Sequence, residues 1–359
     1  MRAHLAVLLV IAAAVSPARA EIRVAAQGPM KGAYGALGTG LAKGAEAGVA
    51  AINAAGGING ELLVFEAADD NCDGDRAAAV ARDLIAREGR RVGGPACMAA
   101  AQAAAPLYDE AGVVMISPVI TDPAFTSLSA LALRITGRDD AQGELAAARI
   151  GGEIPAGRIA VVGDGSPAAK ALAETFTRAP GTRALAFAVK AGEADYGGLV
   201  KDMGAVAAVY FAHMDPGDAG LVARQVKETG QTVALFGSDS LLDGAYLKAA
   251  GEAAIGTRVT FPADPLASPA ARPVADALKA GGVVAEGAVL PAYAAVEAYG
   301  AAARAGKVND GPGLTRWLKG ARDLNTVLGA ISFDGHGDLT PPPFVWYNVE
   351  SGGFVRDSQ

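Results

Sequence analysis

Short apolar runs along the chain alternate with segments whose apolar residues recur every three or four positions. Such runs are typical of strands buried in a parallel sheet, and the longer period is typical of a helix with one buried face. The first part of the chain is therefore predicted to hold strands at Ile22–Ala26, Leu62–Phe65 and Val113–Ile116, and helices at Gly44–Ala55 and Arg76–Arg87.

The same alternation starts again after residues 137–143. The strands of this second series are predicted at Ile159–Val162, Ala184–Val189, Ala207–Phe211 and Val233–Phe236, and its helices at Pro167–Thr177, Leu199–Met203 and Ala219–Lys227. Alternating strands and helices imply a parallel sheet with helices on both faces. Two such series predict an α/β fold with two doubly wound lobes, and a ligand would bind beyond the carboxyl ends of the strands.

The first twenty residues have the pattern of a secretory signal peptide. A positive start, Met1–His4, precedes the apolar run Leu5–Val15, and Ala18–Ala20 fits the small-residue cleavage site. The run is shorter than the roughly 17–25 residues that span a bilayer. We therefore expect residues 1–20 to be removed and the exported chain, residues 21–359, to be soluble.

Length and charge narrow the possibilities further. The mature chain has 359 − 20 = 339 residues, which exceeds the ~250–300 residues of a single core and favours two lobes. The formal charge of −7 includes Arg2 and Arg19, so the mature chain carries −7 − 2 = −9. An acidic chain without a cluster of Lys and Arg is not expected to bind nucleic acid.

The two cysteines are Cys72 and Cys97. In an oxidising compartment they are expected to form a disulfide, worth about 3.5 kcal/mol in the chain-entropy description, although two buried free thiols are the alternative. The segment Asp69–Gly74 resembles half of a calcium loop, but the twelfth position is Val80 rather than Glu. We expect a polar loop there and no metal site.

Glycines are concentrated in residues 28–44, which are predicted to form a loop. Gly38, Gly40 and Gly44 follow a GxGxxxG spacing instead of the GxGxxG of dinucleotide-binding loops. We expect these glycines to build a tight turn or to let backbone amides approach a ligand.

Catalytic groups are sparse. The mature chain has only His213 and His336, no G-x-S-x-G elbow and no spacing of His and Cys suited to a metal. His213 follows a predicted strand and either approaches the cleft or lies on an exposed loop. These observations predict no catalytic residues and no cofactor, so the chain is expected to bind a ligand and not to be an enzyme.

Several motifs along the chain resemble, in order, those of the leucine/isoleucine/valine-type periplasmic binding proteins. They are the segments Gly44–Glu46, Ile52–Gly60, Asp69–Asp73 with Cys97, Ile116–Pro118 with Thr121, Arg134–Gly137 and Phe333–Asp338. The resemblance implies a type I periplasmic binding fold, in which a three-crossover hinge joins the lobes, with crossovers near Asp139, Pro262 and Gly335. The first lobe would hold residues 21–140 and 263–335, and the second lobe residues 141–262 and 336–359.

The resemblance also implies a role. The protein would be a monomer in the periplasm that captures an amino acid or a related small amine or amide as its lobes close. It would then deliver this ligand to an inner-membrane ABC permease with ATPase subunits. A ligand-sensing protein of the same fold, or a binding protein for a small acid other than an amino acid, are the alternatives.

Part of the family's pocket matches this sequence. Thr121 aligns with a threonine that contacts the ligand's carboxylate and ammonium, and Val119 would offer its backbone carbonyl to the ammonium. Asp239 aligns with the acid of the second lobe that pairs with the ammonium. Met98 stands where the family has a carboxylate-binding serine, and its thioether cannot donate a hydrogen bond. The backbone amides of Met98 and Ala99 could still do so.

Three further positions align with aromatic residues of the family. They are Leu37, Ala168 and Met214. Together with Met98, they predict a softer and differently shaped pocket.

Overall fold

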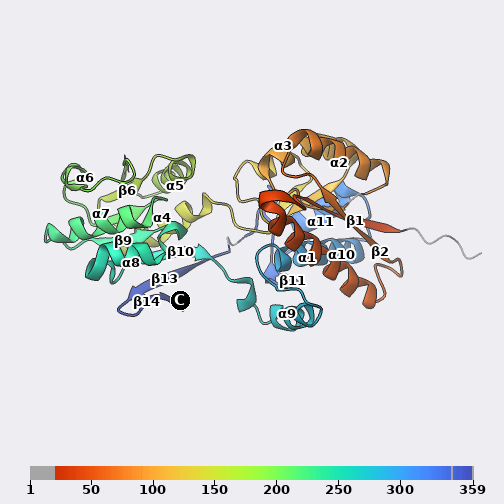
Figure 1. The fold of residues 1–359 in the computed structure, drawn as a ribbon. Coiled ribbons are helices and arrows are strands. Elements are labelled where there is room, and N and C mark those ends of the chain that lie inside the picture. Colours follow the sequence, from red (N-terminus) through yellow and green to blue (C-terminus); the bar gives the residue numbers. More distant parts are fainter. Residues whose placement is uncertain (1–20, 90, 341–342, 358–359) are drawn as a thin grey trace, which may run out of the picture.

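The chain forms two separate sheets, each covered by helices and joined to the other by three segments of chain (Figure 1). The computed structural model describes residues 21–89, 91–340 and 343–357. The predicted signal peptide, residues 1–20, lies outside this part. Among the described residues, none of the helices has the length and apolar character that crossing a membrane requires.

The first lobe is built on a sheet of parallel strands in the order β2-β1-β3-β4-β5. Its strands are β1 Ile22–Gly28, β2 Leu63–Asp69, β3 Arg91–Gly93, β4 Val114–Ser117 and β5 Ala132–Arg134. Its helices are α1 Gly35–Ala54, α2 Gly74–Ala86, α3 Met98–Ala111, α9 Ala271–Ala280, α10 Val289–Gly306 and α11 Gly311–Gly320, with 3-10 turns at Gly32–Tyr34, Phe125–Ser127 and Pro265–Ala267.

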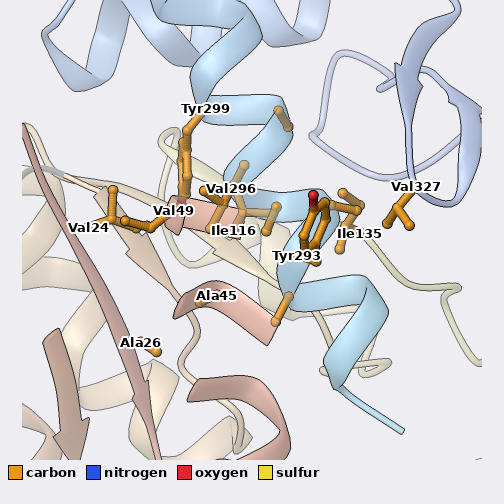
Figure 2. Close-up of a cluster of buried hydrophobic side chains, with 14 of the residues drawn as sticks. Val24, Ala26, Ala45, Val49, Ile116, Ile135, Tyr293, Val296, Tyr299 and Val327 are labelled. Carbon is orange, nitrogen blue, oxygen red and sulfur yellow. The ribbon is translucent and has the colours of Figure 1, made fainter. Parts of the chain in front are cut away.

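Helices cover both faces of this sheet. Successive strand residues point to opposite sides, so they enter two different cores. Val24 and Ala26 of β1 join the core formed with α1, α10 and α11, while Ala25 joins the core formed with α2 and α3. Figure 2 shows Val24, Ala45 of α1 and Tyr299 of α10 within the first of these cores. The predicted doubly wound arrangement is therefore present in this lobe.

The second lobe repeats the strand order and extends it. The order is β7-β6-β8-β9-β10-β13-β14, in which the last two strands are antiparallel. Its strands are β6 Ile159–Gly163, β7 Ala184–Ala188, β8 Ala208–Phe211, β9 Ala234–Gly237, β10 Arg258–Pro262, β13 Phe344–Glu350 and β14 Gly353–Arg356. Its helices are α4 Ala141–Glu153, α5 Pro167–Arg178, α6 Gly197–Met203, α7 Pro216–Glu228 and α8 Gly244–Ala250, with 3-10 turns at Asp239–Leu241 and Gly251–Ala254.

The core of the second lobe is divided in the same way. Val209 and Phe211 of β8 pack with helices α6, α7 and α8, whereas Ala208 and Tyr210 pack with α4 and α5. A small hairpin, β11 Leu324–Thr326 with β12 Gly329–Ile331, follows α11. It adds Val327 and Ile331 to the core of the first lobe.

The chain passes between the lobes through three segments, which we call the hinge segments. They are residues 135–140 between β5 and α4, 263–270 between β10 and α9, and 332–343 between β12 and β13. The first segment leaves from the carboxyl end of β5, and the second leaves from the carboxyl end of β10. Because the neighbouring strands are parallel, the carboxyl edges of both sheets border the hinge.

The predicted glycine loop is wrong, because α1 begins at Gly35, nine residues before the predicted start at Gly44. Within α1, a Cβ on Gly38 would lie 2.0 Å from the carbonyl oxygen of Pro29, and one on Gly44 would lie 2.0 Å from that of Val289 in α10. These glycines therefore permit close packing of a helix. Their place inside α1 shows that they do not form the predicted tight turn.

The predicted disulfide between Cys72 and Cys97 is present, with the two Cα atoms 5.4 Å apart. It ties the loop after β2 to the residue that precedes α3. The neighbouring acids also have structural partners, since Asp69 pairs with Arg76 and the Asp73 side chain accepts from the backbone N–H of Arg76 at the start of α2. The segment is thus a polar loop that holds one disulfide cysteine.

Candidate functional site

Both sheets place their switch points at the hinge. In the first lobe the strand order reverses between β1 and β3, and in the second between β6 and β8. Ligands of such folds bind in the crevice outside the carboxyl ends of these strands. The loops that follow these four strands, together with the hinge segments, therefore border the candidate site.

A cavity of about 340 Å³ lies at the hinge, and its walls come from both lobes and all three hinge segments. Its polar lining residues are Thr121, Thr136, Asp139, Gln142, Asp239, Asp264, Ser332 and Thr340. Its apolar lining residues include Ile135, Pro291, Leu328 and Phe344. The volume is within the ~300–1,000 Å³ range of small-molecule pockets.

Thr121 and Asp239, which the sequence places on different lobes, both line this cavity. Thr121 follows β4 of the first lobe, and Asp239 begins the 3-10 turn after β9 of the second. The Thr121 hydroxyl donates a hydrogen bond of 2.9 Å to Oδ2 of Asp139 in the first hinge segment. Partial burial raises the pKa of the Asp139 carboxyl, and the negative charge of Asp239 raises it further.

Gln142, in the first turn of α4, holds the Asp239 turn in place. Its side chain is only 3% exposed. Its Oε1 accepts from the backbone N–H of Asp239 at 3.1 Å and from the hydroxyl of Thr260 at 2.8 Å. The first hinge segment and the helix that follows it thus contact both predicted ligand residues, Thr121 through Asp139 and Asp239 through Gln142.

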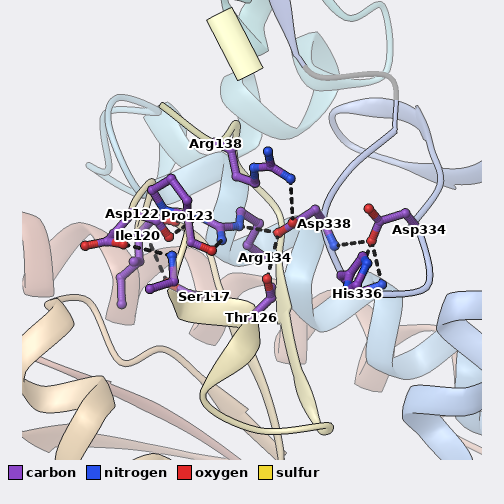
Figure 3. Close-up of polar contacts among 12 residues, drawn as sticks. Ser117, Ile120, Asp122, Pro123, Thr126, Arg134, Arg138, Asp334, His336 and Asp338 are labelled. Carbon is purple, nitrogen blue, oxygen red and sulfur yellow. Dashed lines mark hydrogen bonds and ion pairs between the residues drawn. The ribbon is translucent and has the colours of Figure 1, made fainter. Parts of the chain in front are cut away.

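A buried arginine shapes the loop that carries Thr121 (Figure 3). Arg134 is fully buried, and its Nε donates to Oδ1 of Asp338 at 2.5 Å. Its other guanidinium nitrogens donate to the carbonyl oxygens of residues 120, 122 and 123 at 2.8–3.2 Å. This guanidinium therefore fixes the backbone on both sides of Thr121 to the third hinge segment.

Arg138 joins the first and third hinge segments. It donates to Asp140 through Nε at 2.7 Å and approaches Oδ2 of Asp338 at 3.4 Å. The bound carboxylates raise the pKa of its guanidinium, with the Asp140 hydrogen bond as the largest cause. The charge of Arg138 is thus paired at the hinge, beside the cavity but not among its lining residues.

The other predicted site residues lie near the carboxyl edges but do not line the cavity. Met98 and Ala99 begin α3, where the Met98 side chain packs against the core of α2 and α3 and Ala99 is exposed. Val119 and Leu37 pack against the core of the first lobe. Ala168 lies half-buried in the first turn of α5. Met214 is 3% exposed and belongs to the core of the second lobe.

Sequence reasoning missed Asp139 and Gln142 as site residues, although both line the cavity. In the sequence, Asp139 marks only a predicted crossover. Its acidic side chain at a predicted hinge is the feature that could have indicated a site residue. Tyr34, which lies in the turn after β1 three residues before Leu37, is 61% exposed and does not line the cavity. His213, which was left open, is half-buried after β8 and donates its backbone N–H to Ser238.

Comparison with known proteins gives a consistent result. Residues 21–353 match a family described as periplasmic binding protein. An amino acid binding protein of Pseudomonas aeruginosa is 34% identical over 94% of this chain and 92% of its own length. The Leu/Ile/Val-binding protein BraC3 of Rhizobium johnstonii is 33% identical over 97% of both chains.

A solved structure shares the fold over almost the whole chain. A putative branched-chain amino acid ABC transporter protein of Rhodospirillum rubrum superposes with a TM-score of 0.76 at 24% identity. The match covers 94% of this chain and all of that one. The arrangement of two sheets around a hinge is therefore common to both proteins.

Proposed function

This chain belongs to the periplasmic binding protein family, and we propose that it captures a small amine-bearing molecule for an ABC transporter of the branched-chain-amino-acid type. The proposed ligand is an amino acid or a related amine or amide. It binds between the lobes at the hinge, and the lobes close over it. Its partners are an inner-membrane permease and ATPase subunits, and the protein acts as a monomer.

The observation that carries this proposal is the shared cavity. Thr121 from one lobe and Asp239 from the other line the same space, and the lobes are otherwise joined by three hinge segments. A ligand that touches both residues gains contacts only when the lobes approach each other. Binding and closure are therefore linked, as a transporter needs if it is to distinguish loaded from empty protein.

The site residues carried over from the resemblance keep distinct roles in this proposal. Asp239 pairs with the ligand's ammonium, and the backbone carbonyl of Val119 supports it. Thr121 accepts from the ammonium. Tyr34 is added as an exposed aromatic that could cover the ligand when the lobes close. Met98, Ala99, Leu37, Ala168 and Met214 remain predictions for the closed state.

The compartment and the lobe boundaries also belong to this proposal. The match to the family begins at residue 21, which supports removal of residues 1–20 and a periplasmic location. Boundaries at 140/141 and 262/263 agree with the positions of α4 and β10. For the third boundary, the contacts of Arg134 with Gly337 and Asp338 favour a position a few residues after 335.

A thermal-shift panel of amino acids, amides and aromatic acids tests the proposal. An amine-bearing compound at 100 times its dissociation constant should add about 2.7 kcal/mol of stability. Asp239→Asn should remove this gain. Asp243→Asn should keep it, because Asp243 is exposed and only caps α8. If acids without an amine raise the melting temperature while amines do not, the ammonium assignment is wrong.

A further inference from the structure

The charged residues that line the hinge cavity are all acidic. Three carboxylates line it, those of Asp139, Asp239 and Asp264, and none of its described lining residues is Lys, Arg or His. The Asp239 carboxylate has no hydrogen-bond or ion-pair partner among the residues that the structure describes. A ligand placed beside these groups must therefore supply positive charge or hydrogen-bond donors.

The two hinge arginines cannot supply that charge, because other groups already bind them. Arg134 is enclosed by Asp338 and three backbone carbonyls, and it has no exposed surface. Arg138 pairs with Asp140 and Asp338. Releasing Arg138 toward the cavity would leave the buried Asp140 carboxylate without its cation, and releasing Arg134 would leave three backbone carbonyls and Oδ1 of Asp338 without their charged donor, which is strongly unfavourable.

The hydroxyl of Thr121 is also committed. A hydroxyl has one hydrogen to donate, and that of Thr121 goes to Oδ2 of Asp139. Its remaining lone pairs can only accept. At the other position where the family resemblance places a hydroxyl, Met98 has none, and its half-buried side chain packs against the core of α2 and α3. The side chains of Thr121, Asp139 and Asp239 thus offer acceptors to a ligand, while the hydroxyls of Thr136, Ser332 and Thr340 also line the cavity.

Gln142 provides a donor beside Asp239. Its Oε1 is fixed by two donors, Asp239 N–H and the Thr260 hydroxyl, and this fixes which end of the amide is the NH₂ group. Gln142 is only 3% exposed, and it lines the cavity. Its Nε2 has no acceptor among the described residues. A ligand can therefore satisfy one neutral donor here.

From this balance of donors and acceptors, and resting on the proposed function, we propose that the ligand is an organic cation without a carboxylate. It carries an ammonium or amidine group toward Asp139 and Asp239 and one neutral acceptor, such as an amide oxygen, toward Gln142. A ligand carboxylate would meet two carboxylates and an acceptor hydroxyl with no cation beside it, which disfavours an ordinary α-amino acid.

A matched ligand panel tests this. Each of several side chains, small, aliphatic and aromatic, is offered in four forms: the amino acid, its amide, the amine without the carboxyl group, and the acid without the amine. Leucine, leucinamide, isoamylamine and isocaproic acid are one such set. Affinity is measured by calorimetry at one pH and ionic strength. We expect the amide or amine form of the best side chain to bind at least about tenfold more tightly than its amino acid.

The outcomes separate the two proposals. If an amino acid binds as tightly as its amide, or more tightly, the inference is wrong and the proposed function stands. If only the acid forms bind, both are wrong. Failure of every amine and amide to bind also overturns the inference.

Two variants test the mechanism with a matched loss of charge. Asp139→Ala removes a carboxylate and releases the Thr121 hydroxyl, so the preference for amide over amino acid should fall about tenfold. Asp264→Ala also removes a lining carboxylate, but one that accepts from Leu266 N–H and binds no hydroxyl. It should change the preference much less. An equal effect of both variants would contradict the role assigned to Thr121.

Discussion

At the scale of single residues, the site depends on side chains that neighbouring residues hold in place through hydrogen bonds. Thr121 is oriented by Asp139, and its loop is held by Arg134. The Asp239 turn is held by Gln142. Because a buried donor left without an acceptor costs about 1–3 kcal/mol, these supporting residues affect stability and ligand placement together.

Gln142 allows the two effects to be separated. Gln142→Leu leaves the Asp239 N–H without its acceptor, so we expect a loss of about 1–3 kcal/mol in unfolding free energy and weaker ligand binding. Thr260→Val removes only the second donor to Gln142 and keeps the bond to Asp239. It should lower stability by about 1 kcal/mol and leave the affinity unchanged. Urea unfolding and calorimetry measure both quantities. If Gln142→Leu and Thr260→Val weakened ligand binding equally, Gln142 would have only a structural role.

Glu297 in α10 provides a test of pH dependence away from the site. Burial raises the pKa of its carboxyl above the ordinary value of 4.5, while its Oε2 accepts from the backbone N–H of Val327. Ionisation of this group therefore disfavours the folded state. This loss of stability is absent below the unfolded pKa, grows as the pH rises toward the folded pKa, and is complete above the folded pKa.

Glu297→Gln removes the charge and keeps the acceptor. We expect a melting temperature higher by on the order of 1 °C at neutral pH, and no gain at about pH 4. Thermal unfolding of both proteins across this range measures the difference. A gain that is constant with pH would show that the carboxylate charge is not its cause.

At the scale of elements, the strands β6 to β9 of the second lobe are predicted almost to the residue, whereas β10, β13 and β14 are not predicted. The run Ile159–Val162 became β6, Ile159–Gly163, because both faces of this strand are buried and every residue is apolar. By contrast, β3 and β5 were missed. Each has three residues and includes an arginine, Arg91 or Arg134, whose burial depends on partners far along the chain.

The residues of the candidate site also differ in whether they could be predicted from the sequence. Thr121 and Asp239 could be assigned from sequence because whole motifs resemble a known family. Gln142 could not, since the bond that makes it part of the site joins it to Asp239, 97 residues away. Local periodicity carries no information about such a distant contact. In α1 even the local pattern gives a wrong helix start, because Gly44 is needed for close packing against Val289 of another helix.

The glycines of α1 test this explanation of helix packing. Gly44→Ala adds a Cβ 2.0 Å from the backbone oxygen of Val289, which cannot move away cheaply, so we expect a loss of about 1–3 kcal/mol. Gly40→Ala meets nothing closer than 3.6 Å and should stabilise the helix by up to about 1 kcal/mol. Denaturant unfolding measures both. A stabilising Gly44→Ala would contradict the close packing of α1 against α10.

At the scale of the whole molecule, the two lobes bury apolar cores of their own and are connected by charged hinge segments. Each lobe has its own pair of cores, and no core among the described residues draws members from both sheets. The junction includes polar contacts, among them those of Arg134 and Arg138 with Asp338. Such a junction restrains the lobes weakly compared with a shared apolar core.

Calorimetry should therefore reveal two unfolding transitions in the ligand-free protein, because neither lobe needs the other to bury its core. A ligand that contacts Thr121 in one lobe and Asp239 in the other stabilises only the closed pair, so saturation should raise both transitions and bring them together. The panel compound with the largest thermal shift is the probe. In Asp239→Asn the same compound should leave the two transitions apart. If the probe raises one transition alone, it binds a single lobe, and the coupling of binding to closure does not hold.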